Sequence, residues 1–144
     1  MGAGDRVEGI MPTSIQVNES KIHGMGCYAT SPIPRGQIVA EYVGELIDYA
    51  EAVRRNYKAH PNYSEYILQV KKNLFIDAAR LGNESRFINH SCEPNCILKV
   101  MKKRAFIVAL RTIAPGEELT YDYMYDPKYR EPCSCGAKTC RGYI

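Results

Sequence analysis

The chain has 144 residues, of which 45% are hydrophobic and 24% are charged, and its formal net charge is +3. This length fits one domain with a real core, and the composition is ordinary for a soluble globular protein. The mild charge argues against a nucleic-acid-binding domain, which usually has a basic face and a higher pI. No apolar run is long enough to cross a membrane, and no charged-then-apolar leader marks a secretory signal.

The opening four residues are typical of a cut edge or a frayed terminus. We therefore expect residues 1–13 to be an N-terminal extension and the chain to be a domain excised from a longer protein. Most of the remaining chain has the pattern of short strands, with one helix over residues 48–60 that Asp48 caps and Pro61 stops. Gly44 predicts a bulge or a close backbone approach. The expected strands are residues 14–17, 37–46, 66–70, 74–77, 97–101, 105–110 and 117–123.

A glycine-rich turn is expected at residues 22–28, where Gly24 and Gly26 flank Met25. Such glycines let a backbone come close to a ligand. The signal is weak on its own, because no GxGxxG pattern and no long βαβ unit accompany it. A plain turn is the alternative interpretation.

Residues 86–96, with the sequence RFINHSCEPNC, place many hydrogen-bonding side chains beside the apolar Phe87 and Ile88. Pro94 and Asn95 favour a turn. One interpretation is a partly buried polar pocket, because buried polar groups must be paired. The other is a loop whose polar groups cap neighbouring backbone, and composition alone leaves both open.

The segment ELTYDY at residues 118–123 places Tyr121 and Tyr123 on one face of a strand and Asp122 on the other. Two phenols on one face can be aromatic core, or they can line a narrow channel and offer hydroxyls to a ligand. The chain has 11 tyrosines against three phenylalanines and no tryptophan, which favours the channel.

Three of the six cysteines, Cys133, Cys135 and Cys140, stand close together near the C-terminus. A tetrahedral zinc site needs four ligands, so a fourth from elsewhere would tie the tail to the body of the protein. An even number of cysteines can also form disulfides, but that framework is typical of secreted chains short of core. Zinc-binding thiolates in a cytosolic or nuclear protein are the favoured interpretation.

Taken together, these segments resemble the SET domain of protein-lysine methyltransferases. The likeness rests on residues 23–26 (HGMG), 41–45 (EYVGE), 86–96 and 118–123, and the three terminal cysteines match the post-SET zinc segment of that family. Order and spacing agree from about residue 14 to the end. We therefore expect a SET domain over residues 14–124 and a post-SET zinc-binding segment over residues 125–144.

The resemblance implies a mainly β fold, with small curved sheets around a C-terminal pseudoknot formed where residues 121–123 pass the loop at residues 89–92. It also implies S-adenosylmethionine as methyl donor, S-adenosylhomocysteine as product, a lysine side chain as acceptor, and zinc. Met25 departs from the aromatic residue or arginine often found at its position. The positions that match donor-binding residues are His23, Gly24, Met25, Gly26, Tyr66, Arg86, Phe87, Asn89, His90 and Ser134.

The same likeness gives catalytic roles to Tyr123, Tyr66 and Tyr121. Tyr123 is expected to orient and stabilise the acceptor amine rather than take its proton, because methyl transfer needs alignment more than acid–base work. A hydroxyl at Tyr121 suggests a mono- or dimethylated product. The likeness makes Cys92 the fourth zinc ligand beside Cys133, Cys135 and Cys140, with Cys96 as the alternative to Cys92.

Three functions are open from the sequence. The first is a histone-lysine N-methyltransferase, with the histone H3 tail as the expected partner, or a methyltransferase for a non-histone lysine. The second is a SET-fold binding module with weak or lost catalysis, and the third is a zinc-stapled structural domain. A basic H3 tail needs an acidic groove, for which the candidates are Glu65, Glu84, Asp48 and Glu51.

The target lysine is open too. The lack of a cysteine-rich segment before residue 14 resembles the trithorax type, which acts on position four of H3. Residues 83–87 and 140–144 resemble the absent-small-homeotic type, which acts on position thirty-six. Activating subunits are a further candidate partner, and the expected location is the nucleus, on chromatin.

Overall fold

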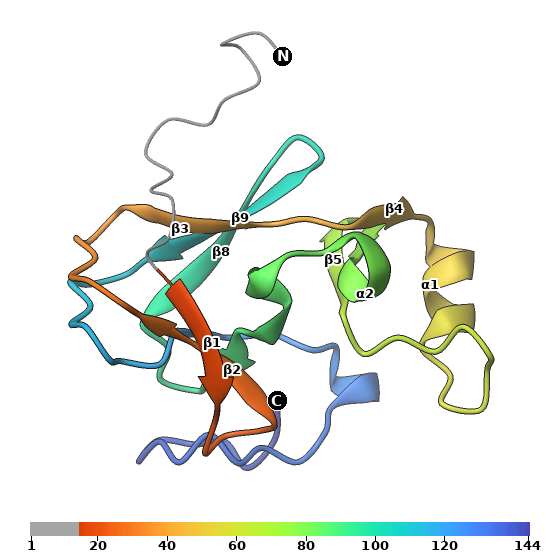
Figure 1. The fold of residues 1–144 in the computed structure, drawn as a ribbon. Helices are drawn as coiled ribbons and strands as arrows, with labels where there is room; N and C mark the ends of the chain where they lie inside the picture. The colour runs from red at the N-terminus through yellow and green to blue at the C-terminus, as the bar shows by residue number, and fades with distance from the viewer. Residues whose placement is uncertain (1–14) are drawn as a thin grey trace, which may run out of the picture.

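A computed structural model describes residues 15–144, and the predicted extension at residues 1–13 lies outside the described residues. Most elements in the described part are short strands, which confirms the mainly β prediction (Figure 1). None of the helices found there has the length and apolarity needed to cross a bilayer. In chain order the elements are β1 (Ile15–Glu19), β2 (Met25–Ala29), β3 (Ile38–Tyr42), β4 (Glu45–Ile47), α1 (Tyr49–Arg55), β5 (Ile67–Lys71), β6 (Leu74–Asp77), α2 (Ala78–Leu81), the 3-10 helix η2 (Glu84–Phe87), β7 (Asn89–His90), β8 (Cys96–Met101), β9 (Arg104–Ala109), β10 (Thr120–Tyr121) and the 3-10 helix η3 (Pro127–Tyr129).

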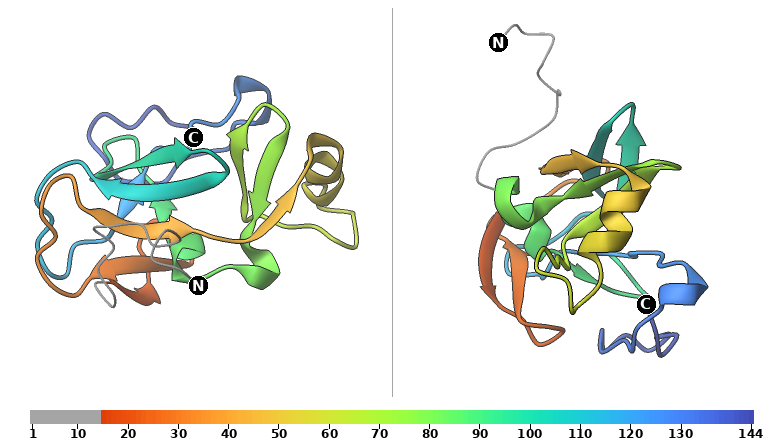
Figure 2. Two further views of the ribbon diagram at one scale, coloured as in Figure 1. Left: turned by 90° about the horizontal axis from the view of Figure 1, so that it is seen from above. Right: turned by 90° about the vertical axis from the view of Figure 1, so that its right-hand side faces the viewer.

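The strands form small separate sheets. β1 and β2 make an antiparallel hairpin, β3–β9–β8 and β4–β6–β5 make three-stranded sheets, and β10 pairs with β7. The two three-stranded sheets lie side by side, and the chain passes from one to the other between β3 and β4 (Figure 2). A Cβ on Gly44, in this link, would lie 2.4 Å from the carbonyl oxygen of Asp77. The strand expected over residues 37–46 is therefore two strands, divided where glycine permits the predicted close approach.

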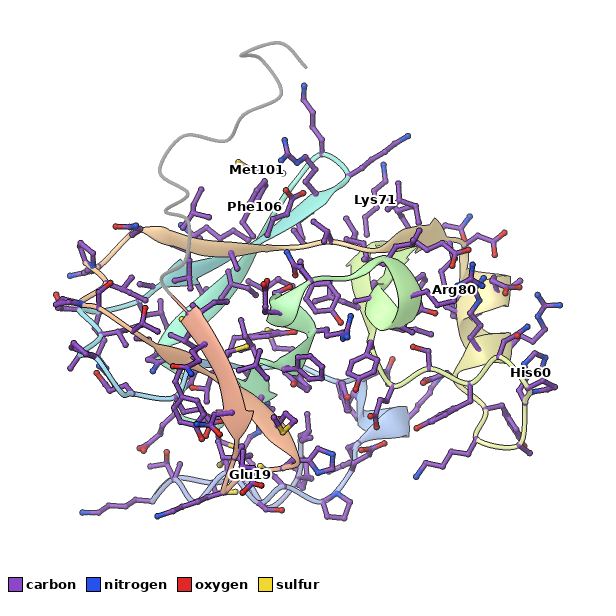
Figure 3. The ribbon with its side chains drawn as sticks, in the orientation of Figure 1. Glu19, His60, Lys71, Arg80, Met101 and Phe106 are labelled. Atoms are coloured by element: carbon purple, nitrogen blue, oxygen red, sulfur yellow. The ribbon has the colours of Figure 1, made fainter. Side chains whose placement is uncertain are left out.

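The core lies around β9, the central strand of its sheet. Five successive residues of β9 are buried, so both faces of this strand are covered, which explains its continuous apolar sequence. Phe106, which Figure 3 labels, is among these buried residues, and its ring lies 5.1 Å from the guanidinium of Arg104. Ile33 and Ile113, which form an isolated bridge, and Leu119 complete the most buried part of the core.

Helix α1 begins as predicted and ends earlier than predicted. The carboxylate of Asp48 accepts a hydrogen bond of 2.9 Å from the backbone N–H of Glu51, so Asp48 is the N-cap. The helix ends at Arg55 rather than before Pro61. The carbonyl of Arg55 accepts a hydrogen bond from the N–H of Ser64 at 2.7 Å, which shows that the chain turns back at this point.

The predicted crossing of two distant segments is present. β10 pairs with β7 in parallel, with Thr120 opposite Asn89 and Tyr121 opposite His90. The strand expected over residues 117–123 is reduced to two residues, because the rest of this segment bonds to other parts of the chain. The side chain of Asn95 accepts from the N–H of Thr120 at 2.9 Å and donates to the carbonyl of Glu118 at 2.9 Å. Two polar segments far apart in sequence thus become neighbours.

Candidate active site and metal centre

A cluster of tyrosines follows β10. The rings of Tyr121 and Tyr123 lie 4.8 Å apart between centroids, and those of Tyr123 and Tyr125 lie 5.7 Å apart. The predicted alternation is confirmed, because Asp122 instead contacts Arg141 at 2.7 Å. Tyr42, at the end of β3, is also buried, and its phenol is electrostatically coupled to those of Tyr121 and Tyr123.

These phenols are neutral at physiological pH. Burial, reinforced by the neighbouring phenols, holds the pKa values of Tyr121 and Tyr123 well above the usual value. Burial, together with Glu131, Tyr63 and Glu65, raises the pKa of Tyr125 to about 12. The hydroxyl of Tyr123 donates to the carbonyl of Ile88 at 2.5 Å. Tyr123 is therefore an oriented neutral phenol, a form that cannot accept a proton as a phenolate would.

Three of the predicted donor-site residues form one stack beside the tyrosine cluster. The ring of Tyr66 meets that of Phe87 edge-on, with 6.1 Å between centroids. The guanidinium of Arg86 lies 4.7 Å from the ring of Phe87 and 5.8 Å from that of Tyr66. The hydroxyl of Tyr42 donates to the carbonyl of Tyr66 at 2.8 Å, so this stack is tied to the end of β3.

The turn that joins β1 to β2 carries His23 and Gly24, and Met25 is the first residue of β2; all three are exposed. Gly24 has a φ of +45°, in the left-handed region that favours glycine. The side-chain amide of Asn89 donates to the carbonyl of His23 at 3.1 Å and to that of Met25 at 3.0 Å. The structure therefore brings the first predicted donor-site segment, through its backbone, to the second.

His90 connects the tyrosine cluster to the sulfur atoms. Its side chain is only 3% exposed, and its Nδ1 accepts a hydrogen bond of 3.1 Å from the N–H of Tyr123. Its Nε2 lies 3.4 Å from the Sγ of Cys92. Burial lowers the pKa of His90, although the Asp122 carboxylate acts in the opposite direction. A neutral imidazole with Nδ1 as acceptor leaves Nε2 as the donor toward sulfur.

The four cysteines Cys92, Cys133, Cys135 and Cys140 meet in space. Their sulfur atoms all lie within 4.8 Å of one another, with Cys92 Sγ 3.9 Å from Cys133 Sγ and 4.0 Å from Cys140 Sγ. Tetrahedral zinc with Zn–S bonds of about 2.3 Å places its sulfur ligands roughly 3.8 Å apart, so this donor set fits zinc. Cys96, the alternative to Cys92, is fully buried in β8 and is outside the cluster.

The thiols of this cluster have divergent acidities. Burial raises the pKa of Cys133 to about 12 and also raises that of Cys92. Burial acts on Cys135 too, but hydrogen bonds from backbone groups and from the neighbouring thiols lower its pKa to about 6. Four thiolates this close repel one another, and a divalent cation is the charge that lets all four ionise.

The tail is held by two further contacts near this cluster. The backbone N–H of Arg141 donates to the Sγ of Cys92 at 3.4 Å, and its guanidinium contacts the Asp122 carboxylate at 2.7 and 3.2 Å.

A cavity of about 350 Å³ lies between the tail and the segment after β10, with no predicted donor-site residue among its described lining residues. Ser134 is exposed between two of the cysteines. The cavity lining consists of Asp122, Met124, Tyr125, Pro127, Arg130, Arg141, Tyr143 and Ile144.

Three residues of the site were given no role by the sequence. Tyr42 and Tyr125 extend the tyrosine cluster, and the excess of tyrosine over phenylalanine was the available signal. The Glu118 carboxylate contacts Asn89 at 3.0 Å. Its motif was recognised, but nothing in the sequence separates Glu118 from Glu117 beside it.

A parallel strand pair that joins two polar segments, next to tyrosines and a tail closed by four cysteines, is the arrangement that the sequence motifs predict. Residues 24–124 match the SET domain family, and the chain belongs to this family. The resemblance seen in the sequence is confirmed.

Relatives that are named by function are similar to this chain over most of its length. It is 46% identical over 138 residues to the histone-lysine N-methyltransferase trithorax of Drosophila virilis, covering 90% of this chain and 4% of that protein. It is 42% identical over 132 residues to the H3 lysine-4 specific histone-lysine N-methyltransferase of Schizosaccharomyces pombe, covering 87% of this chain and 14% of that protein. The chain thus spans only a small part of these relatives.

Solved structures with the same fold contain donor or product. Arabidopsis thaliana SUVH6 in complex with SAM superimposes with a TM-score of 0.77 at 31% identity, covering 90% of this chain and 32% of that one. KRYPTONITE in complex with mCHH DNA, an H3(1-15) peptide and SAH gives a TM-score of 0.74 at 31% identity, covering 90% of this chain and 29% of that one.

Proposed function

We propose that this chain is the catalytic domain of a histone-lysine N-methyltransferase, which transfers a methyl group from S-adenosylmethionine to a lysine of the histone H3 tail. The observation that carries the proposal is the placement of Tyr123. Its neutral hydroxyl is fixed on the carbonyl of Ile88, one residue before Asn89, whose amide holds the His23–Met25 turn. The names of the relatives and the ligands of the structural neighbours support the same reaction.

The donor would lie along the residues that the structure gathers around Asn89. The carbonyls of His23 and Met25 hold the side-chain amide of Asn89, and the buried imidazole of His90 binds the N–H of Tyr123. When bound, S-adenosylmethionine supplies a methyl group on a positively charged sulfur. The residues assigned to donor binding are His23, Gly24, Met25, Gly26, Tyr66, Arg86, Phe87, Asn89, His90 and Ser134, of which His23, Gly24, Met25 and Ser134 are exposed.

Tyr123, Tyr121 and Tyr66 are assigned to the lysine acceptor. A lysine amine has a pKa of about 10.4 in water and must lose a proton before it can accept a methyl group. A channel lined by neutral phenols and backbone carbonyls favours the uncharged amine by excluding water, and it holds the nitrogen in line. Tyr123 orients the amine and does not take its proton, because burial keeps the pKa of this phenol high.

Zinc is assigned to Cys92, Cys133, Cys135 and Cys140, in accordance with the separations of their sulfur atoms. The role of the metal is mechanical, because it joins the tail to the loop that follows β7. We keep residues 14–124 and 125–144 as the proposed limits of the SET domain and the post-SET segment. The hydrophobic core cluster contains residues as far along the chain as Tyr121, and Tyr123 packs against it. The cysteine-rich part of the tail lies beyond both.

A basic tail requires acidic neighbours at the channel. Glu65 and Glu131 are the best placed, since both act electrostatically on Tyr125 and Glu65 also acts on Tyr66. Of the candidates from the sequence, Asp48 caps α1 and Glu51 pairs with Arg55 at 2.6 Å, so both carboxylates are already engaged. Position four of H3 is the proposed target, because several relatives are named as specific for that lysine.

Further features of the proposal come from the relatives. The relatives are named as enzymes that methylate histones, and histones are part of chromatin, which supports a nuclear location. Activating subunits remain a proposed partner. The hydroxyl of Tyr121 beside Tyr123 supports a mono- or dimethylated product.

The test is methyl transfer from radiolabelled donor to recombinant H3, with H3 variants in which lysine 4 or lysine 36 is replaced by arginine. Activity that disappears with the lysine 4 replacement and persists with the lysine 36 replacement supports the proposal. Activity lost only with the lysine 36 replacement would move the target to that position. A protein that binds the donor and transfers no methyl group to histone or to any other protein would instead be the binding module.

A further inference from the structure

The turn between β1 and β2 is an exposed segment whose position depends on hydrogen bonds. His23, Gly24 and Met25 are exposed, and the Met25 side chain is 42% accessible. Ser20 organises the turn locally: its N–H donates to the carbonyl of Gly24 at 2.8 Å, and its hydroxyl accepts from the N–H of Ile22 at 3.0 Å. Figure 3 labels Glu19, the last residue of β1, at the end of the molecule where this turn begins.

A single carboxylate joins this turn to the rest of the site. The hydroxyl of Ser20 donates to Glu118, at 2.9 Å from Oε1 and 2.7 Å from Oε2. The amide of Asn89 donates to Glu118 Oε2 at 3.0 Å as well as to the carbonyls of His23 and Met25. The side-chain amide of Asn89 has two N–H donors and three acceptors, so one N–H is shared between two acceptors. As one of the three acceptors, the Glu118 carboxylate helps to fix the orientation of the amide that holds the turn.

The backbone of Glu118 is itself rigidly placed. The N–H of Leu119 donates to the carbonyl of Cys27 at 2.7 Å, the N–H of Ala29 donates to the carbonyl of Glu117 at 3.0 Å, and Tyr28 forms a bridge with Glu118. The segment therefore runs antiparallel beside β2. A side chain that starts from such a fixed backbone can locate a neighbouring turn more accurately than one that starts from a mobile loop.

Gly26 shows how closely the carboxylate approaches the turn. A Cβ at this position would lie 2.4 Å from Glu118 Oε2 and 3.0 Å from the Cβ of Ser20. The space that a side chain at Gly26 would occupy is filled by the Glu118 carboxylate. The glycine recognised in the sequence as a means of approaching a ligand is thus required for the approach of this glutamate.

We propose that Glu118 is a positioning residue for the methyl donor, acting through Asn89 and the His23–Gly26 turn. This inference rests on the proposed function, because it assumes that the donor binds at that turn. Glu118 begins the segment that carries Tyr121 and Tyr123 at its other end, so one stretch of backbone sets the places of donor and acceptor.

Glu117→Gln is a matched control for Glu118→Gln. Glu117 is the preceding residue and its carboxylate is also engaged, but its partners are the exposed Arg111, at 2.7 Å, and the N–H of Ala114. These partners lie outside the turn. The two variants make the same change of acid to amide at neighbouring positions. Comparing them therefore distinguishes the effect of a displaced turn on donor binding from the effect of losing a carboxylate in general.

The experiment measures S-adenosylhomocysteine binding by calorimetry and steady-state methyl transfer with both variants of the zinc-loaded protein. Loss of a hydrogen bond to a charged acceptor corresponds to about a tenfold change in an equilibrium constant. We expect Glu118→Gln to weaken product binding and raise the KM for the donor by about tenfold or more, with a smaller change in kcat. Glu117→Gln should leave both unchanged, and hydrogen exchange at residues 20–26 should rise only in Glu118→Gln.

The outcomes separate the two ideas. Equal affinities in Glu118→Gln and Glu117→Gln, with equal exchange at the turn, would overturn the role of Glu118. A wild-type protein that binds neither donor nor product would overturn the proposed function itself. If Glu118→Gln does not fold, Ser20→Ala removes one partner of the carboxylate, and an affinity identical to wild type in that variant would overturn the inference.

Discussion

Replacing Cys135 by alanine removes one of the four sulfur atoms that meet at the base of the tail. We expect this protein to lose zinc and methyltransferase activity and to keep its β core. The reason is that the tail and the core are stabilised by different interactions. Among the described residues, the hydrophobic core cluster ends at Tyr121, and Tyr123 is the last residue that packs against it, so the cysteine-rich tail contributes nothing to it.

The magnitudes decide the result. Ordering a chain opposes folding by about 1–2 kcal/mol per residue, so holding the tail in one place needs many kcal/mol. A structural zinc site supplies roughly 10–16 kcal/mol in small domains. Two contacts that remain are the hydrogen bond from the N–H of Arg141 to Cys92 Sγ and the ion pair of Arg141 with Asp122. The side chains of this ion pair are 40% and 24% exposed, and such a pair contributes little. Without the metal, the tail should therefore separate from the Asn89–His90 region while the sheets remain.

The assay compares Cys135→Ala with Cys96→Ala. Cys96 is fully buried in β8 and away from the sulfur cluster, so its replacement should lower the free energy of unfolding by about 1 kcal/mol and leave zinc in place. Zinc content by atomic absorption, thermal unfolding and methyl transfer are measured on both. Turnover at the wild-type rate in a metal-free Cys135→Ala protein would refute the reasoning.

Three other substitutions address the catalytic segment and its contact with the tail. Tyr123→Phe removes the hydroxyl that donates to Ile88 and should reduce kcat by about 100-fold, while S-adenosylhomocysteine binding by calorimetry stays the same; unaltered turnover would exclude a role for the hydroxyl. Tyr121→Phe should move the products, followed by mass spectrometry, toward higher methylation states, and an unchanged distribution would count against its proposed role. Arg141→Ala should raise the KM for the donor several-fold with zinc retained, whereas Arg111→Ala, in a comparable exposed ion pair with Glu117, should not; equal KM values in the two variants would show that the Arg141 contact is dispensable.

The sequence predicted most of the β architecture because most strands carry their own signal. It missed β2, since residues 22–28 were expected to be a turn, and the two-residue β7. The hairpin over residues 96–109 was visible from two apolar runs around Lys102, which has a φ of 58° at its tip. The close approach at Gly44 was also predicted, although not the division of the strand that contains it. The end of α1 was misplaced because it depends on a contact with Ser64, and local sequence carries no information about that contact.

Prediction of the candidate site from the sequence is limited in the same way. Motif likeness selected Asn89, His90 and Tyr123, and it gave Cys92 as the partner of the terminal cysteines. It could not distinguish Glu118 from Glu117, since their difference lies entirely in what faces them. Nor could it assign Tyr42, which reaches the tyrosine cluster only because β3 ends beside Tyr66. Contacts between segments far apart in sequence are properties of the assembled sheets, and they must be observed.

The alternation of side chains around β10 explains how so small a domain can organise three different contacts. Glu118 faces the turn between β1 and β2, where it binds Ser20 and Asn89. Tyr121 and Tyr123 face the aromatic cluster, and Asp122, between them, faces Arg141 of the tail. Because β10 is fixed in parallel register on β7, a shift of one residue would exchange these faces and separate all three contacts at once. The pairing of Thr120 with Asn89 and of Tyr121 with His90 is therefore the structural condition on which the proposed donor turn, the proposed acceptor channel and the proposed zinc site of the tail jointly depend.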